Sequence, residues 1–407
     1  MAALGPFGPA PCLAAGVSGG PDSMALALLA DRWAQDHGGS LLSLIVDHGL
    51  RPESGQEAAL AAARLGARGL AVRLLPISGL RRGPALPERA RVARFEALQS
   101  ACQEAGILHL LVGHHAADQA ETVLMRSLSG SGSIGLAGML PLVEMTWLRL
   151  LRPLLGFPPV RLRATLAAAG VEWIEDPSNQ DPAALRPRMR SLRRDRDGIG
   201  VATGALLAAA VASAKRRAVR AKNAATELAE DVVVRPEGFA ILSSPAVSAD
   251  VLAALLQALS GATYPPPSRS VSALAAAPRP ATLAGVRLLP AGRLGPGLLA
   301  VREAAAMAPP VPARPHAVWD GRFRLLADTC VPAGATLGCL GDDAAQVRHL
   351  SSLPSAVLRT LPAIRRGLKI HSVPHIDFPD RRTCEGLSLL FSPAGAAAPP
   401  PFPFGDA

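Results

Sequence analysis

The sequence predicts an α/β protein in which a parallel sheet is flanked by helices, followed by a helical connector and a smaller α+β region. Three observations predict this fold. Short apolar runs alternate with helical patterns over residues 1–200, which is typical of βαβ units. A glycine-rich loop joins the first apolar run to the first helical pattern. From residue 236 onward the chain is dense in Pro and Gly and contains short strand-like runs.

The predicted elements follow one another in a regular order. Apolar runs predict strands at residues 12–17, 41–46, 71–77 and 109–112. The intervening patterns predict helices at residues 22–33, 57–65, 88–104 and 118–128. Prolines then precede a helix at residues 160–169, and an Ala-rich stretch predicts a long helix at 205–230. We therefore expect a first domain at 1–200, a basic helical connector at 201–235, an accessory region at 236–392 and a disordered tail at 393–407.

The composition predicts a soluble protein that binds nucleic acid. The chain has 42 Lys and Arg against 32 Asp and Glu, a net charge of +10, which favours a polyanionic partner, nucleic acid before membrane. A GC-rich genome that substitutes Arg for Lys would not by itself shift the sign of the charge. The five cysteines contain no C-x-x-C pair, which argues against zinc-knuckle and iron–sulfur sites and for reduced thiols. No signal peptide or membrane-spanning run is expected, so the predicted location is cytoplasmic.

The strongest chemical signal is the loop between the first strand and the first helix. Open α/β sheets bind ligands at such a place, and glycines let main-chain N–H groups turn inward around an anion. Serine hydroxyls and the positive end of the helix add to this anion site. A carboxylate within a phosphate site requires a divalent cation, for which Mg²⁺ is the usual choice. The alternative is a Gly-Gly-Pro turn with a helix cap. The loop residues are Ser18, Gly19, Gly20, Pro21, Asp22 and Ser23.

Two further polar clusters end predicted strands. Asp47 and His48 follow the second strand, and His114 follows the fourth, leading into Asp118 and Glu121. Asp118 and Glu121 are three residues apart on a helix and share a face, although a solvated helix face would have the same spacing. For the pair His114-His115 the alternatives are a metal pair, a helix cap or a site histidine; adjacent histidines on a regular strand cannot both face one ion. We expect the three clusters to meet at one edge of the sheet.

Residues 130–135 match G-x-G-x-x-G but follow a predicted helix, not a strand. A dinucleotide site needs a strand–turn–helix unit around this motif. We interpret the segment as a flexible loop that could close over a substrate.

Taken in order, these motifs give the chain a resemblance to the tRNA(Ile)-lysidine synthetase family, N-type ATP pyrophosphatases with the PP-loop fold of adenine nucleotide α-hydrolases. Three positions depart from the family pattern: Ala117 stands where many members have a second Asp, Phe95 replaces a Tyr, and Pro187 interrupts an Arg-rich segment. The resemblance covers about half of the chain and is faint in the C-terminal third. It is carried by residues 18–23, 46–54, 90–95, 113–115, 118–122, 135–139, 152–155 and 176–179.

The resemblance implies an ATP-dependent carbon–nitrogen ligase. ATP and Mg²⁺ would adenylate the wobble cytidine in the CAU anticodon of tRNA(Ile), and L-lysine would then displace AMP to give lysidine, with diphosphate as the other product. Asp22 and Ser23 are the implied catalytic residues, with Asp22 as the metal ligand, and the whole loop from Ser18 to Ser23, together with Asp47 and His48, would bind ATP. The implied substrate-binding residues are Arg94, His114, Asp118 and Glu121.

The tRNA backbone would meet a basic surface, and the accessory region at 236–392 would also face the tRNA. A related thiolase and a non-catalytic RNA-binding scaffold are the alternatives; thiolases generally need paired cysteines, and the intact Asp22 argues against a scaffold. No membrane partner is expected, and a homodimer is left open. The predicted tRNA-binding residues are Arg186, Arg188, Arg190, Arg193 and Arg194.

Overall fold

The computed structural model describes residues 1–407 except 78, 81–82, 84, 131–134, 146, 176–194, 196, 245, 327–330, 380–387, 394 and 396–407. The chain forms two compact units, Met1–Ala218 and Val219–Pro401. The division between them falls inside one long helix, α7 (Val201–Asp231). The arginines predicted to bind tRNA and most of the predicted disordered tail lie outside the described residues.

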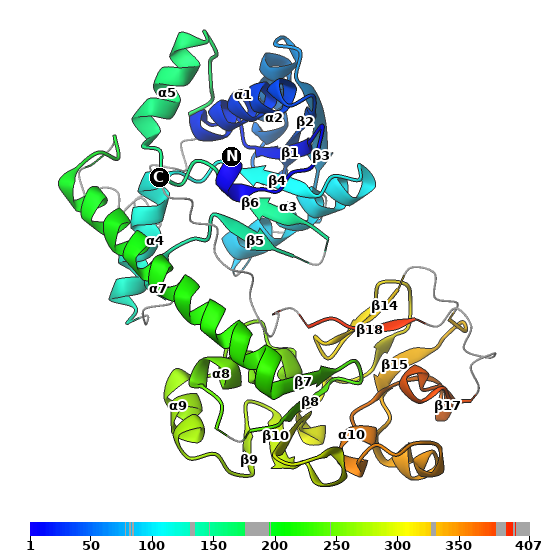
Figure 1. Ribbon diagram of the computed structural model, residues 1–407. Helices are drawn as coiled ribbons and strands as arrows, with labels where there is room; N and C mark the ends of the chain where they lie inside the picture. Colours follow the sequence, from blue (N-terminus) through cyan, green and yellow to red (C-terminus); the bar gives the residue numbers. More distant parts are fainter. Residues whose placement is uncertain are drawn as a thin grey trace. The chain divides into compact units, whose positions relative to one another are not determined.

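The first unit contains a six-stranded sheet with the order β3-β2-β1-β4-β6-β5 (Figure 1). The first five of these strands in the sheet order run parallel, as the α/β prediction requires. β5 is antiparallel to β6, so the sheet is mixed at this edge and otherwise parallel, and the prediction of a parallel sheet flanked by helices is confirmed. The strands are β1 (Cys12–Val17), β2 (Ser40–Asp47), β3 (Ala71–Pro76), β4 (His109–Val112), β5 (Leu142–Glu144) and β6 (Arg149–Leu151).

Helices cover both faces of this sheet because its central strands are apolar on both sides. Leu13 and Val17 of β1 belong to a core shared with α1 and α5, whereas Ala14 belongs to a second core with Leu98 of α3. A Cβ on Gly16 would lie 3.3 Å from Leu98 Cδ1, so α3 packs closely on the second face. The helices are α1 (Pro21–Asp36), α2 (Ser54–Gly66), α3 (Leu86–Glu104), α4 (Ala116–Leu128) and α5 (Pro159–Ala168).

The second unit is α+β, as predicted, and its sheets are antiparallel. A five-stranded sheet has the order β7-β8-β11-β10-β9 and shares a core with α8 and α9. Its strands are β7 (Val232–Arg235), β8 (Phe239–Leu242), β9 (Ala281–Leu283), β10 (Val286–Pro290) and β11 (Leu298–Arg302), with α8 (Ala249–Ser260) and α9 (Ser268–Ala276). β7 lies in the predicted connector, but it pairs with β8 as part of this sheet.

Two smaller sheets complete the second unit, with the orders β12-β15-β16-β17 and β13-β14-β18. Their strands are β12 (Val311–Pro312), β13 (Val318–Trp319), β14 (Phe323–Leu325), β15 (Thr336–Cys339), β16 (Pro362–Arg366), β17 (Lys369–Ser372) and β18 (Leu389–Phe391), with helix α10 (Ser355–Leu358). Short 3₁₀ helices are formed by Ala2–Leu4, Gly135–Ala137, Gly292–Leu294, Ala304–Ala306, Gly341–Ala345, Arg348–Leu350 and Pro374–Ile376. In the part of the chain that the structure describes, no helix is long and apolar enough to cross a membrane.

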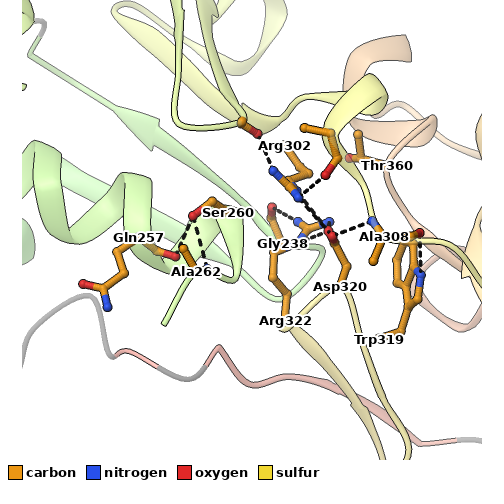
Figure 2. A network of polar contacts seen from close by, with 12 residues as sticks. Gly238, Gln257, Ser260, Ala262, Arg302, Ala308, Trp319, Asp320, Arg322 and Thr360 are labelled. Carbon is orange, nitrogen blue, oxygen red and sulfur yellow. Dashed lines mark hydrogen bonds and ion pairs between the residues drawn. The ribbon is translucent and has the colours of Figure 1, made fainter. Parts of the chain in front are cut away.

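A buried ion cluster lies between the sheets of the second unit (Figure 2). Asp320 accepts hydrogen bonds from Arg302 Nε at 3.0 Å, from Arg322 Nε at 2.8 Å and from the main-chain N–H of Ala308 at 2.9 Å. The side chain of Arg322 is 0% exposed and that of Asp320 2%. Burial lowers the pKa of Arg322 to about 10, and Asp320 opposes this shift. One carboxylate therefore holds two buried cations that come from different strands and turns.

Candidate functional site

The loop predicted to bind phosphate connects β1 to α1, and it needs glycine at its second position. Gly19 has φ of +81°, in the left-handed region that favours glycine. A Cβ there would lie 3.0 Å from Ile174 Cδ1, while Gly19 O accepts from Ile174 N at 2.9 Å. The next glycine, Gly20, caps α1, whose first residue is Pro21. This sequence therefore brings the positive end of a 16-residue helix to the end of β1.

Hydrogen bonds between its own serines close the loop. Ser23 Oγ donates to Gly20 O at 3.0 Å and accepts from Ser18 N at 3.1 Å. The hydroxyls of Ser18 and Ser23 lie 3.2 Å apart. Because the single hydroxyl proton of Ser23 goes to Gly20 O, Ser18 donates in the serine–serine contact. In this arrangement Ser23 holds the shape of the loop, and its hydroxyl proton is used within it.

Asp22 has a carboxylate oxygen that is suited to bind a hard cation such as Mg²⁺. Its side chain is 28% exposed, and Oδ2 lies 3.4 Å from His115 Nε2. Oδ1 is buried and has no hydrogen-bond partner among the described residues. A buried polar oxygen without a partner is costly, and Mg²⁺ is bound in proteins through one or two carboxylates together with phosphates and waters. This donor fits Mg²⁺. Within the described ranges no cluster of three or more His, Cys, Asp or Glu side chains could hold a metal by itself.

His115 links Asp22 to Asp118, and the sequence interpretation did not select it as a site residue. It is the N-cap of α4: Nδ1 accepts from Asp118 N at 3.4 Å, and the Asp118 carboxylate accepts from His115 N at 3.2 Å. With Nδ1 as acceptor, the neutral imidazole carries its proton on Nε2, which faces Asp22. Of the alternatives for the histidine pair, a helix cap is thus found for His115. The available signal was its place three residues before Asp118, the spacing of a capping box.

Asp118 is half-buried and Glu121 is buried, and both lie on α4. The side chain of Asp118 is 13% exposed, and Glu121 is 1% exposed. The alternative of a solvated helix face is therefore wrong for these two residues. A pair of carboxylates on one face of α4 supplies negative charge that is suited to a cationic ligand.

Asp47 and His48 end β2, the parallel neighbour of β1. Asp47 Oδ1 accepts from Ser54 Oγ at 2.7 Å and from Gly49 N at 3.0 Å, and these bonds lower the pKa of Asp47, that from Ser54 most. His48 Nδ1 accepts from Leu50 N at 3.2 Å. Both side chains thus shape the turn that leads into α2. The clusters after β1, β2 and β4 lie at the carboxyl ends of neighbouring parallel strands, as the topology prediction required.

Arg94, His114 and the G-x-G-x-x-G segment were also selected from the sequence. Arg94 lies on α3 with its side chain exposed, and desolvation by surrounding atoms, together with the charge of Arg91, lowers its pKa. His114 is half-buried beside the cap residue. The G-x-G-x-x-G segment lies mostly outside the described residues. The segment after it is held to α4, because Gln119 donates to Met139 O at 3.0 Å and accepts from Met139 N at 2.7 Å.

Gly113, which follows β4, packs closely against the start of α1. A Cβ at this position would lie 3.1 Å from both Ser23 Cα and Ser23 N, so Gly113→Ala must displace the start of α1. We expect the variant to weaken ATP binding and to lose about 1–2 kcal/mol of stability through overpacking. Isothermal titration with ATP checks this result. Gly66→Ala is the matched control, since a Cβ on Gly66 meets nothing within 4 Å. Equal ATP affinities of both variants and the parent would contradict this packing role.

Known proteins share both the first unit and part of the second. Residues 4–194 match the family described as the PP-loop domain. The tRNA(Ile)-lysidine synthase of Mesorhizobium japonicum is 36% identical over 325 residues, which cover 76% of this chain and 71% of that protein. The enzyme of the same name from Bradyrhizobium sp. is 46% identical over 228 residues, 56% of this chain and 62% of that protein.

The alignments with these relatives cover only part of each protein. That with the tRNA(Ile)-lysidine synthase of Rhodopseudomonas palustris, at 43% identity, covers 54% of this chain and 63% of that protein. The chain thus spans less than two thirds of the length of the Bradyrhizobium and Rhodopseudomonas relatives. A solved U34-tRNA thiolase from Methanococcus maripaludis has a TM-score of 0.43 and 16% identity, over 51% of this chain and 74% of that one. A likeness this low bears on neither fold nor function.

Proposed function

Because the chain belongs to the tRNA(Ile)-lysidine synthase family, we propose that it uses ATP to adenylate the wobble cytidine of tRNA(Ile) with a CAU anticodon and then joins lysine to it. The observation that carries this proposal is the chain of contacts from Asp22 through His115 to Asp118. These contacts link the loop after β1 to the half-buried Asp118 on α4, the helix that also carries the buried Glu121. A ligase that activates one substrate and attacks it with a cationic second substrate needs this juxtaposition.

The loop after β1 supports the first half of the reaction. The oxygen on C2 of cytosine is a poor leaving group, so it must attack the α-phosphate of ATP and become an adenylate ester, with release of diphosphate. Main-chain N–H groups at the start of α1 would hold the departing phosphates, and the hydrogen-bonded hydroxyls of Ser18 and Ser23 would keep the loop in shape around them. Asp22 would hold Mg²⁺ through Oδ1, with His115 fixing Oδ2. When bound, Mg²⁺ supplies positive charge that stabilises the departing diphosphate.

Residues of α3 and α4 support the second half. Asp118 and Glu121 would hold an ammonium group of lysine, and Arg94 would bind the lysine carboxylate by a bidentate contact. The lysine ε-amine must lose a proton before it attacks C2, because only the neutral amine is a nucleophile. Attack on C2 releases AMP and leaves a new C–N bond. His114, next to the cap of α4, is proposed to contact the same substrates.

A basic surface is proposed to hold the tRNA backbone. Its members are Arg186, Arg188, Arg190, Arg193 and Arg194, which stay a sequence-based prediction because they lie outside the described residues. Phosphate contacts of this kind position an RNA without reading its sequence. The names of the curated relatives support lysidine formation over a thiolase reaction.

Omission of each substrate tests the proposed function. Release of diphosphate from ATP should require the unmodified tRNA, and turnover to AMP and lysidine should also require lysine. ATP is labelled so that AMP, adenylated tRNA and diphosphate are separated in one assay. Diphosphate release that is independent of tRNA, or an undiminished rate with a tRNA that lacks the CAU anticodon, would reject the proposal.

Glu121→Gln separates the two half-reactions. The change keeps the size of a side chain that is 1% exposed but removes its charge, and a lost charge-assisted hydrogen bond costs about 1.5–3 kcal/mol. We expect lysine transfer to slow by about tenfold to a hundredfold while adenylation continues, so adenylated tRNA accumulates. Glu96→Gln on α3, which is exposed, is the control. Lysidine formation at the parental rate would place the lysine site elsewhere.

A further inference from the structure

Two arginines beside the proposed site are held over one short loop. Arg126 Nη1 donates to Gly135 O at 3.0 Å and to Gly138 O at 2.6 Å. Arg152, which directly follows β6 and is 9% exposed, donates from Nη1 to Leu140 O at 2.7 Å. The accepting carbonyls all lie within residues 135–140, so the two guanidinium groups lie over the same few residues of main chain.

A third arginine adds its charge to this pair. Burial, with smaller contributions from the positive charges of Arg91 and Arg126, lowers the pKa of Arg152 to about 10. Arg91 projects from α3, and its guanidinium lies 5.4 Å from the centre of the Phe95 ring. None of the three pairs with a carboxylate of a described residue, and the Nε of Arg152 is buried without a hydrogen-bond partner among those residues. The carbonyls orient these cations but do not neutralise them, which leaves a site for an anion.

The cluster lies at the edge of the sheet where the proposed chemistry takes place. β6 runs parallel to β4, so Arg152 at the carboxyl end of β6 lies on the same edge as His115 after β4. The loop proposed to bind the ATP phosphates follows β1, which β4 separates from β6. Two strand spacings amount to about 10 Å. The arginine at the end of β6 therefore follows a different strand of this edge from the loop that is proposed to hold the ATP phosphates.

We propose that Arg91, Arg126 and Arg152 bind a backbone phosphate of the RNA strand that presents the cytidine to be adenylated. This inference rests on the proposed function and adds a contact that fixes the RNA strand beside the reacting base. A planar guanidinium suits a phosphate because it offers paired N–H donors. Since the contact is to the backbone, it holds the strand without selecting its sequence.

Arg91→Gln is the informative variant because Arg91 is exposed and its guanidinium lies over the Phe95 ring of its own helix, whereas Arg126 and Arg152 hold the 135–140 loop. Arg32→Gln on α1, also an exposed arginine, is the matched control for loss of one positive charge. Binding is measured by fluorescence anisotropy at several salt concentrations. The probes are an anticodon stem-loop RNA with the CAU loop and the same stem with a scrambled loop.

Arg91→Gln should weaken binding of both RNAs by about tenfold, as for one lost charge-assisted contact, and lower the slope of log affinity against log salt by about 0.7. Arg32→Gln should leave both unchanged, and ATP and lysine affinities should not change in either variant. An unaltered salt slope, a loss confined to the CAU loop, or weaker binding of ATP or lysine alone would overturn the inference. A parent protein that forms no lysidine would instead overturn the proposed function, so the two failures are distinguishable.

Discussion

Asp22→Asn is expected to remove nearly all adenylation of the tRNA. The buried Oδ1 of Asp22 has no hydrogen-bond partner among the described residues, and Oδ2 faces His115 Nε2 at 3.4 Å. The amide keeps the shape of the side chain but replaces one anionic oxygen by an N–H donor, which a divalent cation cannot use as a ligand. A lost metal contact weakens the stabilisation of charge on diphosphate by several kcal/mol, which corresponds to at least about a hundredfold in rate.

The rate of AMP formation and the Mg²⁺ dependence of ATP binding together check this prediction. Asp36→Asn, at the exposed last residue of α1, is the control for a carboxylate lost from the same helix. Circular dichroism spectra equal to those of the parent would exclude unfolding as the cause. AMP formation by Asp22→Asn at close to the parental rate would remove Asp22 from the proposed metal site.

Asp320→Asn is expected to destabilise the second unit by about 3–5 kcal/mol, the usual cost of removing one partner from a buried ion cluster. Arg302 and Arg322 would then both be buried cations without a carboxylate. Asn is the replacement that changes the backbone least, because φ at Asp320 is +54° and Asn tolerates this left-handed conformation well. The loss is therefore assigned to charge and not to backbone strain.

Native-state hydrogen exchange measures this loss where it should occur. Amides of β11 and β14, the strands beside Arg302 and Arg322, should lose protection, while amides of β1 in the first unit serve as the internal reference. Asp342→Asn removes the carboxylate of an exposed pair with Arg359 and should change protection little, since such pairs contribute little. Unchanged protection of β11 and β14 in Asp320→Asn would show that the cluster is not needed for stability.

The centre of the first unit could be predicted because its strands are continuous apolar runs. β4 occupies the predicted residues, and β1 was predicted as Cys12–Val17, as found. β5 and β6 were missed, since three residues each are too few to show a period of two. The bounds of α2 and α4 begin earlier than predicted, because their first turns contain small and polar residues and not apolar ones.

For the proposed site, the sequence predicted which residues would carry the chemistry but not which of them contact one another. Asp22 and His115 are far apart in the chain, and their contact depends on β1 and β4 being neighbours in the sheet. The use of the Ser23 hydroxyl within its own loop could not be read from residue type. The pairing of Asp320 with Arg302 could likewise not be predicted, because it joins two segments that come together only in the folded chain.

The proposed reaction joins lysine to the wobble cytidine of tRNA(Ile) at the expense of ATP. Nucleoside analysis by liquid chromatography and mass spectrometry tests it most directly, after incubation of an unmodified tRNA(Ile) carrying CAU with the protein, ATP, Mg²⁺ and lysine. The proposed mechanism predicts that the wobble cytidine is replaced by a nucleoside carrying one lysine, and that omission of ATP or of lysine leaves the cytidine intact. An unmodified cytidine in the complete reaction, or modification at another position of the tRNA, would contradict the claim.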